Sequence, residues 1–297
     1  MHKNVKTVLG IFLFFLIGFY ALWDISEWYS NNLKALGDSM PVLSFFNPEL
    51  LALVFTPLIV ATAWRAWSGE SHWSSVWFHS GVPLGILASS ISLVGMFQNA
   101  DDTETIGYFV GESLLAVFYG GAVSFIGYLN LNTDDITIKH SSHSNLTKLC
   151  MLLINTFLIV AGMHYYADID AFVDGSTVYI FIAFASACLL LNRDESKSIY
   201  SLFCETMVIA SLASVIIALI SYSTYQGHPR AIVPPMAIGI LGPLYGAFVI
   251  FQCATFFPET DLREINFGKI SWHLLEISGF WILMVLAPKS LLEMSVW

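Results

Sequence analysis

The chain has 297 residues, of which 56% are hydrophobic and only 11% are charged, and its mean hydropathy is +0.70. Soluble domains carry about 25% charged residues, so this composition excludes a monomeric water-soluble protein and indicates an all-α polytopic membrane protein. The formal charge of −10 argues against nucleic acid as a partner, because phosphate binding needs a basic surface.

Nine segments are apolar enough to cross a bilayer, which takes about 20 residues. In chain order the sequence predicts spans at 5–23, 49–67, 80–97, 106–129, 146–165, 176–191, 202–222, 231–257 and 270–288. The ninth contains His273 and Glu276 and could instead lie partly at the interface. For these two side chains, capping of the inner end of this helix is the favoured interpretation.

Lys and Arg residues fall mostly in the loops that would lie on the same side of the membrane as the N-terminus. This bias predicts a cytoplasmic N-terminus in a bacterial inner membrane. The first apolar segment has no small-residue cleavage site, so we expect a retained span and not a signal peptide.

The cysteines predict neither a disulfide nor a metal site. Cys150, Cys188, Cys204 and Cys253 lie in apolar runs without metal-ligand spacing, which is typical of small buried hydrophobic residues. No nucleophile–base pair, phosphate-binding loop or metalloprotease motif is present, so we expect no enzyme and no cofactor. His164 lies near Asp168, Asp170 and Asp174; a solvated acidic loop is the favoured interpretation and a cation site the alternative.

A Tyr-Gly pair occurs twice inside apolar runs, at Tyr119-Gly120 and at Tyr245-Gly246, 126 residues apart. The same offset aligns further identical residues: Phe46 with Phe172, Phe55 with Phe181, Ile106 with Ile232, Leu115 with Leu241, Val123 with Val249 and Phe125 with Phe251. The pattern favours an internal duplication; the alternative is that two glycine-bearing packing helices simply look alike.

The duplication would divide the chain into two tandem four-helix transmembrane repeats, 1–130 and 131–257, followed by a C-terminal helix in 258–297. Four spans are an even number, so both repeats enter the membrane from the same side. We therefore expect parallel repeats, related by an axis along the membrane normal.

Residues 80–125 resemble the third and fourth membrane helices of MotA-type stator subunits, in the MotA/TolQ/ExbB proton-channel family. The matching features are Pro83, the "LVGMF" and "NADD" motifs, Ile106-Gly107, and Leu115 followed by the Tyr119-Gly120 pair. Residues 171–187 look like the second helix of that family. The large cytoplasmic domain of MotA proteins has no counterpart, because the loop at that place is only about 68–79.

The resemblance implies an ion channel subunit of a stator-like, ion-gradient-driven membrane motor or energy transducer. Protons are the expected ion and Na⁺ the alternative. It also implies a ring of copies of this chain, in contact with membrane lipid, around a single-span MotB/ExbD-like partner. By position, the family's pore-lining residues fall on Ser89 and, in the second repeat, approximately on Ser214. Its two threonines fall on Ala116 and Val117, and on Gly242 and Pro243.

Glu112 is the most informative single residue, because it lies six residues into the fourth span. A carboxylate costs about 2.5–3.5 kcal/mol at the centre of a membrane helix and less toward its ends. Glu112, Ala116, Tyr119 and Gly120 share a face by helical spacing, which predicts a surface that lines a pore or meets a partner helix. The alternative is a glutamate hydrogen-bonded to a neighbouring helix.

Glycines at the Tyr-Gly pairs predict close helix packing, at Gly120, Gly121 and Gly246. Two other functions stay open. A secondary transporter with two parallel repeats would use Glu112 as its coupling carboxylate. A non-conducting scaffold subunit would keep the fold and explain the missing threonines.

Overall fold

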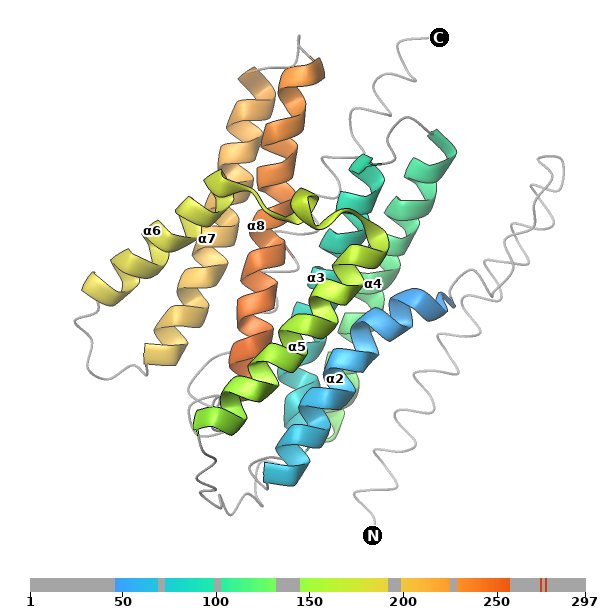
Figure 1. The fold of residues 1–297 in the computed structure, drawn as a ribbon, viewed down its shortest axis with the longest axis vertical. Coiled ribbons are helices and arrows are strands. Elements are labelled where there is room, and N and C mark those ends of the chain that lie inside the picture. Colours follow the sequence, from blue (N-terminus) through green and yellow to red (C-terminus); the bar gives the residue numbers. More distant parts are fainter. Residues whose placement is uncertain are drawn as a thin grey trace, which may run out of the picture.

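The computed structural model describes residues 46–68, 73–98, 103–131, 145–191, 199–224 and 229–256, together with His273 and Glu276. Within these residues all regular structure is helical. The helices are α2 (Pro48–Ser68), α3 (Trp73–Gln98), α4 (Thr103–Leu129), α5 (Asn145–Tyr166), the short 3₁₀ helix η3 (Ile169–Phe172), α6 (Gly175–Leu191), α7 (Ile199–Thr224) and α8 (Pro229–Phe256). Figure 1 shows them as an elongated bundle.

Seven helical segments of the described part are long and apolar enough to cross a membrane. This confirms the prediction of a helical, multi-pass membrane protein. The first predicted span, 5–23, lies outside the described residues, as does nearly all of the ninth. The third span was predicted to begin at residue 80, but α3 begins at Trp73, because serine and histidine side chains in its first turns are buried against neighbouring helices.

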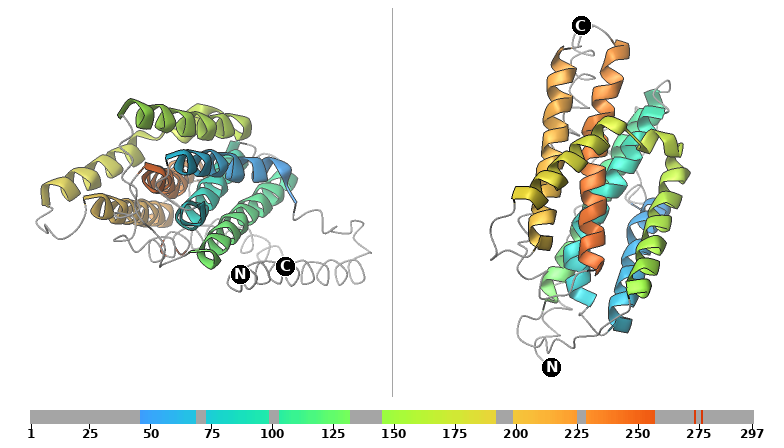
Figure 2. Two further views of the ribbon diagram at one scale, coloured as in Figure 1. Left: turned by 90° about the horizontal axis from the view of Figure 1, so that it is seen from below. Right: turned by 60° about the vertical axis from the view of Figure 1, so that its left-hand side comes forward.

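Helix α3 occupies the centre of the bundle. Every residue of it from His79 to Met96 is buried, since α2, α4, α5 and α8 all pack against it. Seen along the bundle, α4, α3, α8 and α7 follow one another in a row (Figure 2, left). The α3–α8 contact therefore joins the first half of the described chain to the second.

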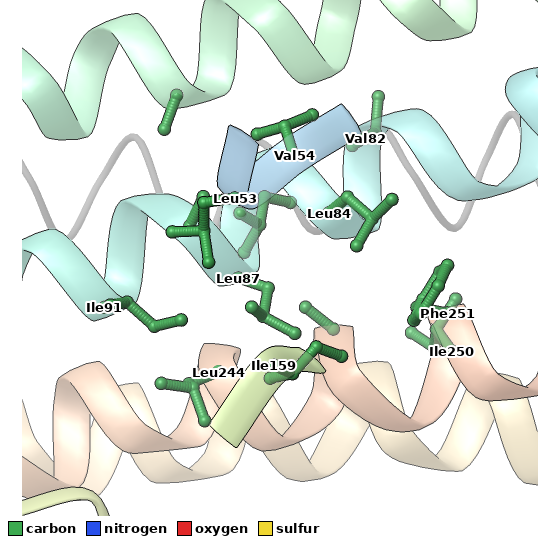
Figure 3. Packing of buried hydrophobic residues seen from close by; sticks show 14 of the residues in the cluster. Leu53, Val54, Val82, Leu84, Leu87, Ile91, Ile159, Leu244, Ile250 and Phe251 are labelled. Carbon is green, nitrogen blue, oxygen red and sulfur yellow. The ribbon is translucent and has the colours of Figure 1, made fainter. Parts of the chain in front are cut away.

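Apolar side chains fill this joint between α3 and α8. Leu87 and Ile91 of α3 face Leu244 of α8, and Phe251 of α8 lies farther along the same contact (Figure 3). All four are at most 1% exposed. The joint thus has the dry, interdigitated packing of a protein core.

Two helices begin with a side-chain cap. Asn47 precedes α2, and its Oδ1 accepts hydrogen bonds from the N–H groups of Glu49 and Leu50, both at 3.0 Å. Asp174 precedes α6, and its Oδ2 accepts from the N–H and the hydroxyl of Thr177, at 2.6 and 2.7 Å. Such caps satisfy N–H groups that the first turn of a helix leaves without partners.

Arg65, near the C-terminal end of α2, binds to the last turn of α8. Its side chain is 1% exposed, and Nε and Nη2 donate to the carbonyl oxygens of Thr255 and Ala254, both at 2.9 Å. These carbonyls belong to the last turn of α8, where a helix has unsatisfied acceptors and a partial negative charge. A cation from α2 thereby stabilises the end of α8.

Candidate functional site

Glu112 lies inside the bundle, with 4% of its surface exposed. Its Oε1 accepts a hydrogen bond from Nδ2 of Asn47, and its Oε2 lies 3.3 Å from the hydroxyl oxygen of Ser92. That hydroxyl also lies 3.0 Å from the carbonyl oxygen of Phe109. Within the described part of the chain, no ion pair is formed by Glu112. The site is therefore a buried carboxyl group held by neutral donors.

Asn47 connects the start of α2 to α4. Its Oδ1 caps α2, which turns Nδ2 toward Glu112 of α4. Its backbone N–H donates to the hydroxyl of Tyr119, also in α4, at 3.2 Å. The sequence "NPE" carries this cap, with Asn at the cap and Pro at the first helical position, a pattern typical of helix starts. The chain sequence alone did not lead us to Asn47 as a partner of Glu112.

Two further hydroxyls lie next to Glu112 and Ser92 in the contact between α3 and α4. The oxygens of Ser89 and Ser113 lie 2.6 Å apart, and both residues are buried. Ser89 is one turn from Ser92 on α3, and Ser113 follows Glu112 on α4. We refer to Asn47, Ser89, Ser92, Glu112 and Ser113 as the Glu112 cluster. Of these five, sequence reasoning selected Ser89 and Glu112 and missed the other three.

Below the Glu112 cluster the backbones of α3 and α4 touch. A Cβ on Gly120 would stand 2.5 Å from the carbonyl oxygen of Gly81 and 2.6 Å from Cα of Gly85. Ala116 is fully buried at the same crossing. The face of α4 that bears Glu112, Ala116 and Gly120 therefore packs against α3 of the same chain, and the polar group ends at this crossing.

Gly121 does not take part in this crossing, and its predicted packing role has no counterpart within the described chain. A Cβ there would meet nothing within 4 Å, because adjacent residues point about 100° apart around a helix and only Gly120 faces α3. The prediction for Gly246 agrees with its surroundings: a Cβ there would stand 2.1 Å from Oγ of Ser211.

The tyrosines of the two Tyr-Gly pairs make the same contact. The Tyr119 hydroxyl accepts from the backbone N–H of Asn47, and the Tyr245 hydroxyl accepts from that of Asp174, both at 3.2 Å. Asn47 and Asp174 are the caps of α2 and α6. The Tyr245 hydroxyl in addition donates to the carbonyl oxygen of Phe172 at 2.7 Å. Each tyrosine thus fixes the start of a helix earlier in the chain.

Ser214 and Gly242, the second-repeat candidates, lie against one another in the α7–α8 contact. A Cβ on Gly242 would stand 2.5 Å from Cβ of Ser214. The Ser214 hydroxyl donates to the carbonyl oxygen of Ala210 at 2.9 Å, within its own helix. The residue 126 positions after Glu112 is Ile238, so the carboxyl group of the Glu112 cluster has no counterpart at this place in the second pair.

The remaining polar candidates make local contacts. Asp174 is the cap of α6, as described above, while Asp168 and Asp170 are exposed. Among the described residues, no three His, Cys, Asp or Glu side chains come close enough to hold a metal ion. His273 Nδ1 lies 3.1 Å from Oε2 of Glu276, and both are about half exposed. Cys204 and Cys253 are buried, whereas Cys150 is exposed, contrary to the expectation for it.

No family model, curated protein or solved structure matches the chain. A functional conclusion therefore has to rest on the Glu112 cluster and on the way the two halves of the chain meet.

Proposed function

We propose that the chain is an ion channel subunit of a stator-like, ion-gradient-driven membrane complex. Copies of the chain form a ring around a single-span partner, and Glu112 binds and releases the transported proton. The observation that carries this proposal is the head-to-tail contact between α3 and α8.

The proposal treats α2–α4 and α6–α8 as two copies of one unit. Both ends of α7 lie 126 residues after the ends of α3. The third and fourth helices of both units cross at a glycine, Gly120 or Gly246, and in both units the neighbouring tyrosine bonds to the cap of the second helix. These correspondences support a duplication more specifically than shared apolar composition does.

The contact between the units is not self-complementary. It joins the third helix of the first unit, α3, to the fourth helix of the second, α8. In the row of Figure 2 the order is fourth, third, fourth, third. A heterologous contact of this kind is repeated by rotation, and it builds a ring when the rotation closes.

The two outer faces of this row correspond to the two faces buried in its middle. On α7, four exposed side chains are Ile209, Leu212, Ile217 and Ile220. The residues 126 positions earlier on α3 are buried: Pro83, Ile86, Ile91 and Val94. On α4, four exposed side chains are Leu114, Phe118, Phe125 and Tyr128. The residues 126 positions later on α8 are buried: Ile240, Leu244, Phe251 and Ala254.

We infer that α7 of one chain packs against α4 of the next as α8 packs against α3 within a chain. Lipid contact alone would also accommodate these apolar side chains, but it does not require that both exposed faces match buried counterparts. A ring of this kind encloses an axis, where a single-span MotB/ExbD-like helix would sit.

Glu112 supplies the ion-binding group in this proposal. Ionisable residues within membrane spans are costly and commonly mark ion paths. The cluster around Glu112 has hydroxyl groups that can donate or accept, which suits proton exchange. One such group per chain would be present, because the second unit has Ile238 at that position.

A cysteine cross-link tests the ring. In a variant without native cysteines, Phe118→Cys and Ile217→Cys should form disulfides between chains under mild oxidation, and a ladder of oligomers should appear on denaturing gels. The pair Leu244→Cys and Ile91→Cys is the matched control, because it should close within one chain. Monomers alone from the first pair, with efficient closure of the second, would refute the ring.

Proton flux tests the role of Glu112. Purified complex in liposomes should dissipate a pH gradient, and Glu112→Gln should reduce the rate at least tenfold. A single-span protein with a membrane-embedded Asp should copurify with the complex. Absence of any such helix would contradict the stator proposal.

A secondary transporter is the second candidate, because the Glu112 cluster is enclosed within one chain and involves no partner residue. Proton uptake that depends on an added substrate, occurs in isolated monomers and disappears in Glu112→Gln would favour the transporter over the channel subunit.

A further inference from the structure

A groove runs between α2 and α5, on the side of the bundle away from the α3–α4 crossing. It has a volume of about 330 Å³, and its lining includes Glu49 and Pro57 of α2 together with Leu158, Gly162, Tyr165 and Tyr166 of α5. Gly162 lets the side chain of Leu53 come close to the backbone of α5, since a Cβ there would stand 2.3 Å from Cδ1 of Leu53.

The groove is polar at one end and apolar at the other. Helix α2 starts at the end where α5 finishes, so Glu49 lies near Tyr165 and Tyr166 (Figure 1). Pro57 and Leu158 lie at the other end. Eight residues of helix separate Glu49 from Pro57, which is about 12 Å along the axis.

The candidate membrane spans place the polar end at the depth expected for a membrane interface. It coincides with the first turn of α2, which is a candidate membrane span, and with the last turn of α5, which is another. The aromatic side chains of Phe46, Tyr108 and Tyr165 are exposed there, and such residues concentrate at the level of lipid headgroups. The apolar end extends from there toward the hydrocarbon layer.

Two groups mark the polar end of the groove, and the Tyr165 hydroxyl already hydrogen-bonds to one of them, Glu49. The hydroxyl of Tyr166 is buried and has no hydrogen-bond partner, a state that costs free energy unless a ligand relieves it. Glu49 is exposed and forms no ion pair with another described residue. Both groups can accept hydrogen bonds, and the carboxylate adds a negative charge.

We propose that this groove binds a phospholipid with a primary ammonium headgroup. The ammonium donates to the carboxylate of Glu49 and to the hydroxyl oxygen of Tyr166, since it carries three N–H donors in a compact group. The first part of one acyl chain lies along Pro57 and Leu158. A choline headgroup lacks N–H donors, and an anionic headgroup is repelled by Glu49, so the site selects among lipids.

Native mass spectrometry of the purified full-length chain tests the proposal. The protein is exchanged into mixtures of phosphatidylethanolamine, phosphatidylcholine and phosphatidylglycerol with identical acyl chains, and the lipids retained at increasing collision energy are counted. We expect phosphatidylethanolamine to be retained about fivefold over phosphatidylcholine, the upper range for one exposed ion pair. Glu49→Gln should remove this preference, and Tyr166→Phe should reduce it.

Two controls separate the site from general effects. Asp170→Asn removes an exposed charge in η3, outside the groove, and should leave the preference unchanged. Ala52→Phe fills the groove while keeping Glu49, and it should abolish retention of this lipid although the protein still elutes as a folded species. Equal retention of the two zwitterionic lipids, or an unchanged preference in Glu49→Gln, would overturn the proposal. Displacement by ethanolamine as effective as by the lipid would also overturn it, because the ligand would then be a small soluble amine.

Discussion

The two helix pairs α3–α4 and α7–α8 share their geometry but differ in their surroundings. Both pairs cross at the glycine of a Tyr-Gly pair, and both tyrosines hold the cap of an earlier helix. In the first pair α3 is enclosed from His79 to Met96, whereas α7 exposes four isoleucines and one leucine. The polar groups differ as well: Glu112 corresponds to Ile238 and Arg65 to Leu191.

This difference separates the requirements of folding from those of chemistry. Features present in both pairs position helices, since a glycine crossing and a tyrosine-bound cap are purely structural contacts. Features present in only one pair have a role at that position of the chain alone. Arg65 of α2 holds the end of α8, and Glu112 provides a buried carboxyl group between α3 and α4.

Gly120→Val should have the largest effect, because its side chain would collide with the backbone of Gly81 and Gly85. Neither backbone can rotate away, so we expect a loss of more than about 3 kcal/mol of stability, the upper range for overpacking, or no folded protein. Thermal unfolding in detergent, monitored by size-exclusion chromatography, measures this loss of stability.

Gly121→Val is the matched control for the crossing within one chain, since a Cβ there meets nothing within the chain, and the monomer of this variant should unfold near the wild-type temperature. Gly246→Ala should be milder than Gly120→Ala, because it meets the rotatable side chain of Ser211. Equal effects of the two alanine variants would show that the crossings are alike in tightness.

Arg65→Met should come next. It leaves the carbonyls of Ala254 and Thr255 without their charged donor, and hydrogen bonds to charged groups contribute about 1.5–3 kcal/mol each. Because the desolvation cost of burying Arg65 disappears at the same time, we expect a net loss of about 2 kcal/mol. Leu191→Met, at the corresponding position of α6, should change the melting temperature little. A wild-type melting temperature for Arg65→Met would mean that the cation is not required at the end of α8.

Asn47→Ala should destabilise the protein more than Asp174→Ala. Both lose a helix cap, which costs about 1 kcal/mol, but Asn47→Ala also removes a donor from buried Glu112. The double variant Asn47→Ala/Glu112→Ala should therefore show coupling between the two residues when compared with the single variants by chemical denaturation. Strictly additive effects would argue against the Asn47–Glu112 contact.

Tyr245→Phe and Tyr119→Phe should have the smallest effects, about 1 kcal/mol for each hydrogen bond lost. Tyr245→Phe should exceed Tyr119→Phe, because its hydroxyl also donates to the carbonyl oxygen of Phe172 at 2.7 Å. Hydrogen exchange at the N–H groups of Asp174 and Asn47 provides a local measure, since each loses its acceptor. Unchanged protection at both would contradict the assigned contacts.

Hydropathy was sufficient to locate the helices within the described residues, because lipid demands long apolar segments. It placed the start of α3 too late, since serines and His79 are polar by type yet buried by position. The Tyr-Gly repeat could be seen in the sequence, but not its purpose, because the partner of each tyrosine is a backbone N–H group about 70 residues away.

The candidate site was predictable only in part. Glu112 and Ser89 were conspicuous as polar residues inside apolar spans. Asn47 was not, because it precedes α2 and contacts Glu112 across 65 positions. The contacts of Arg65 were also invisible in the sequence, since backbone carbonyls carry no residue signature. Whether Gly120 or Gly121 faces α3 depends on the rotation of a helix, which apolar composition does not specify.

The hydroxyl of Ser92 has one hydrogen but lies within reach of two acceptors, the carbonyl oxygen of Phe109 and Oε2 of Glu112. With a charged carboxylate, only one of the two can receive that hydrogen. With a protonated carboxyl group, Oε2 donates to Ser92 and Ser92 donates to Phe109, while Asn47 still donates to Oε1. Each of these groups then has a hydrogen-bond partner without movement of a heavy atom. The contacts around Glu112 can therefore accommodate one added proton on Oε2.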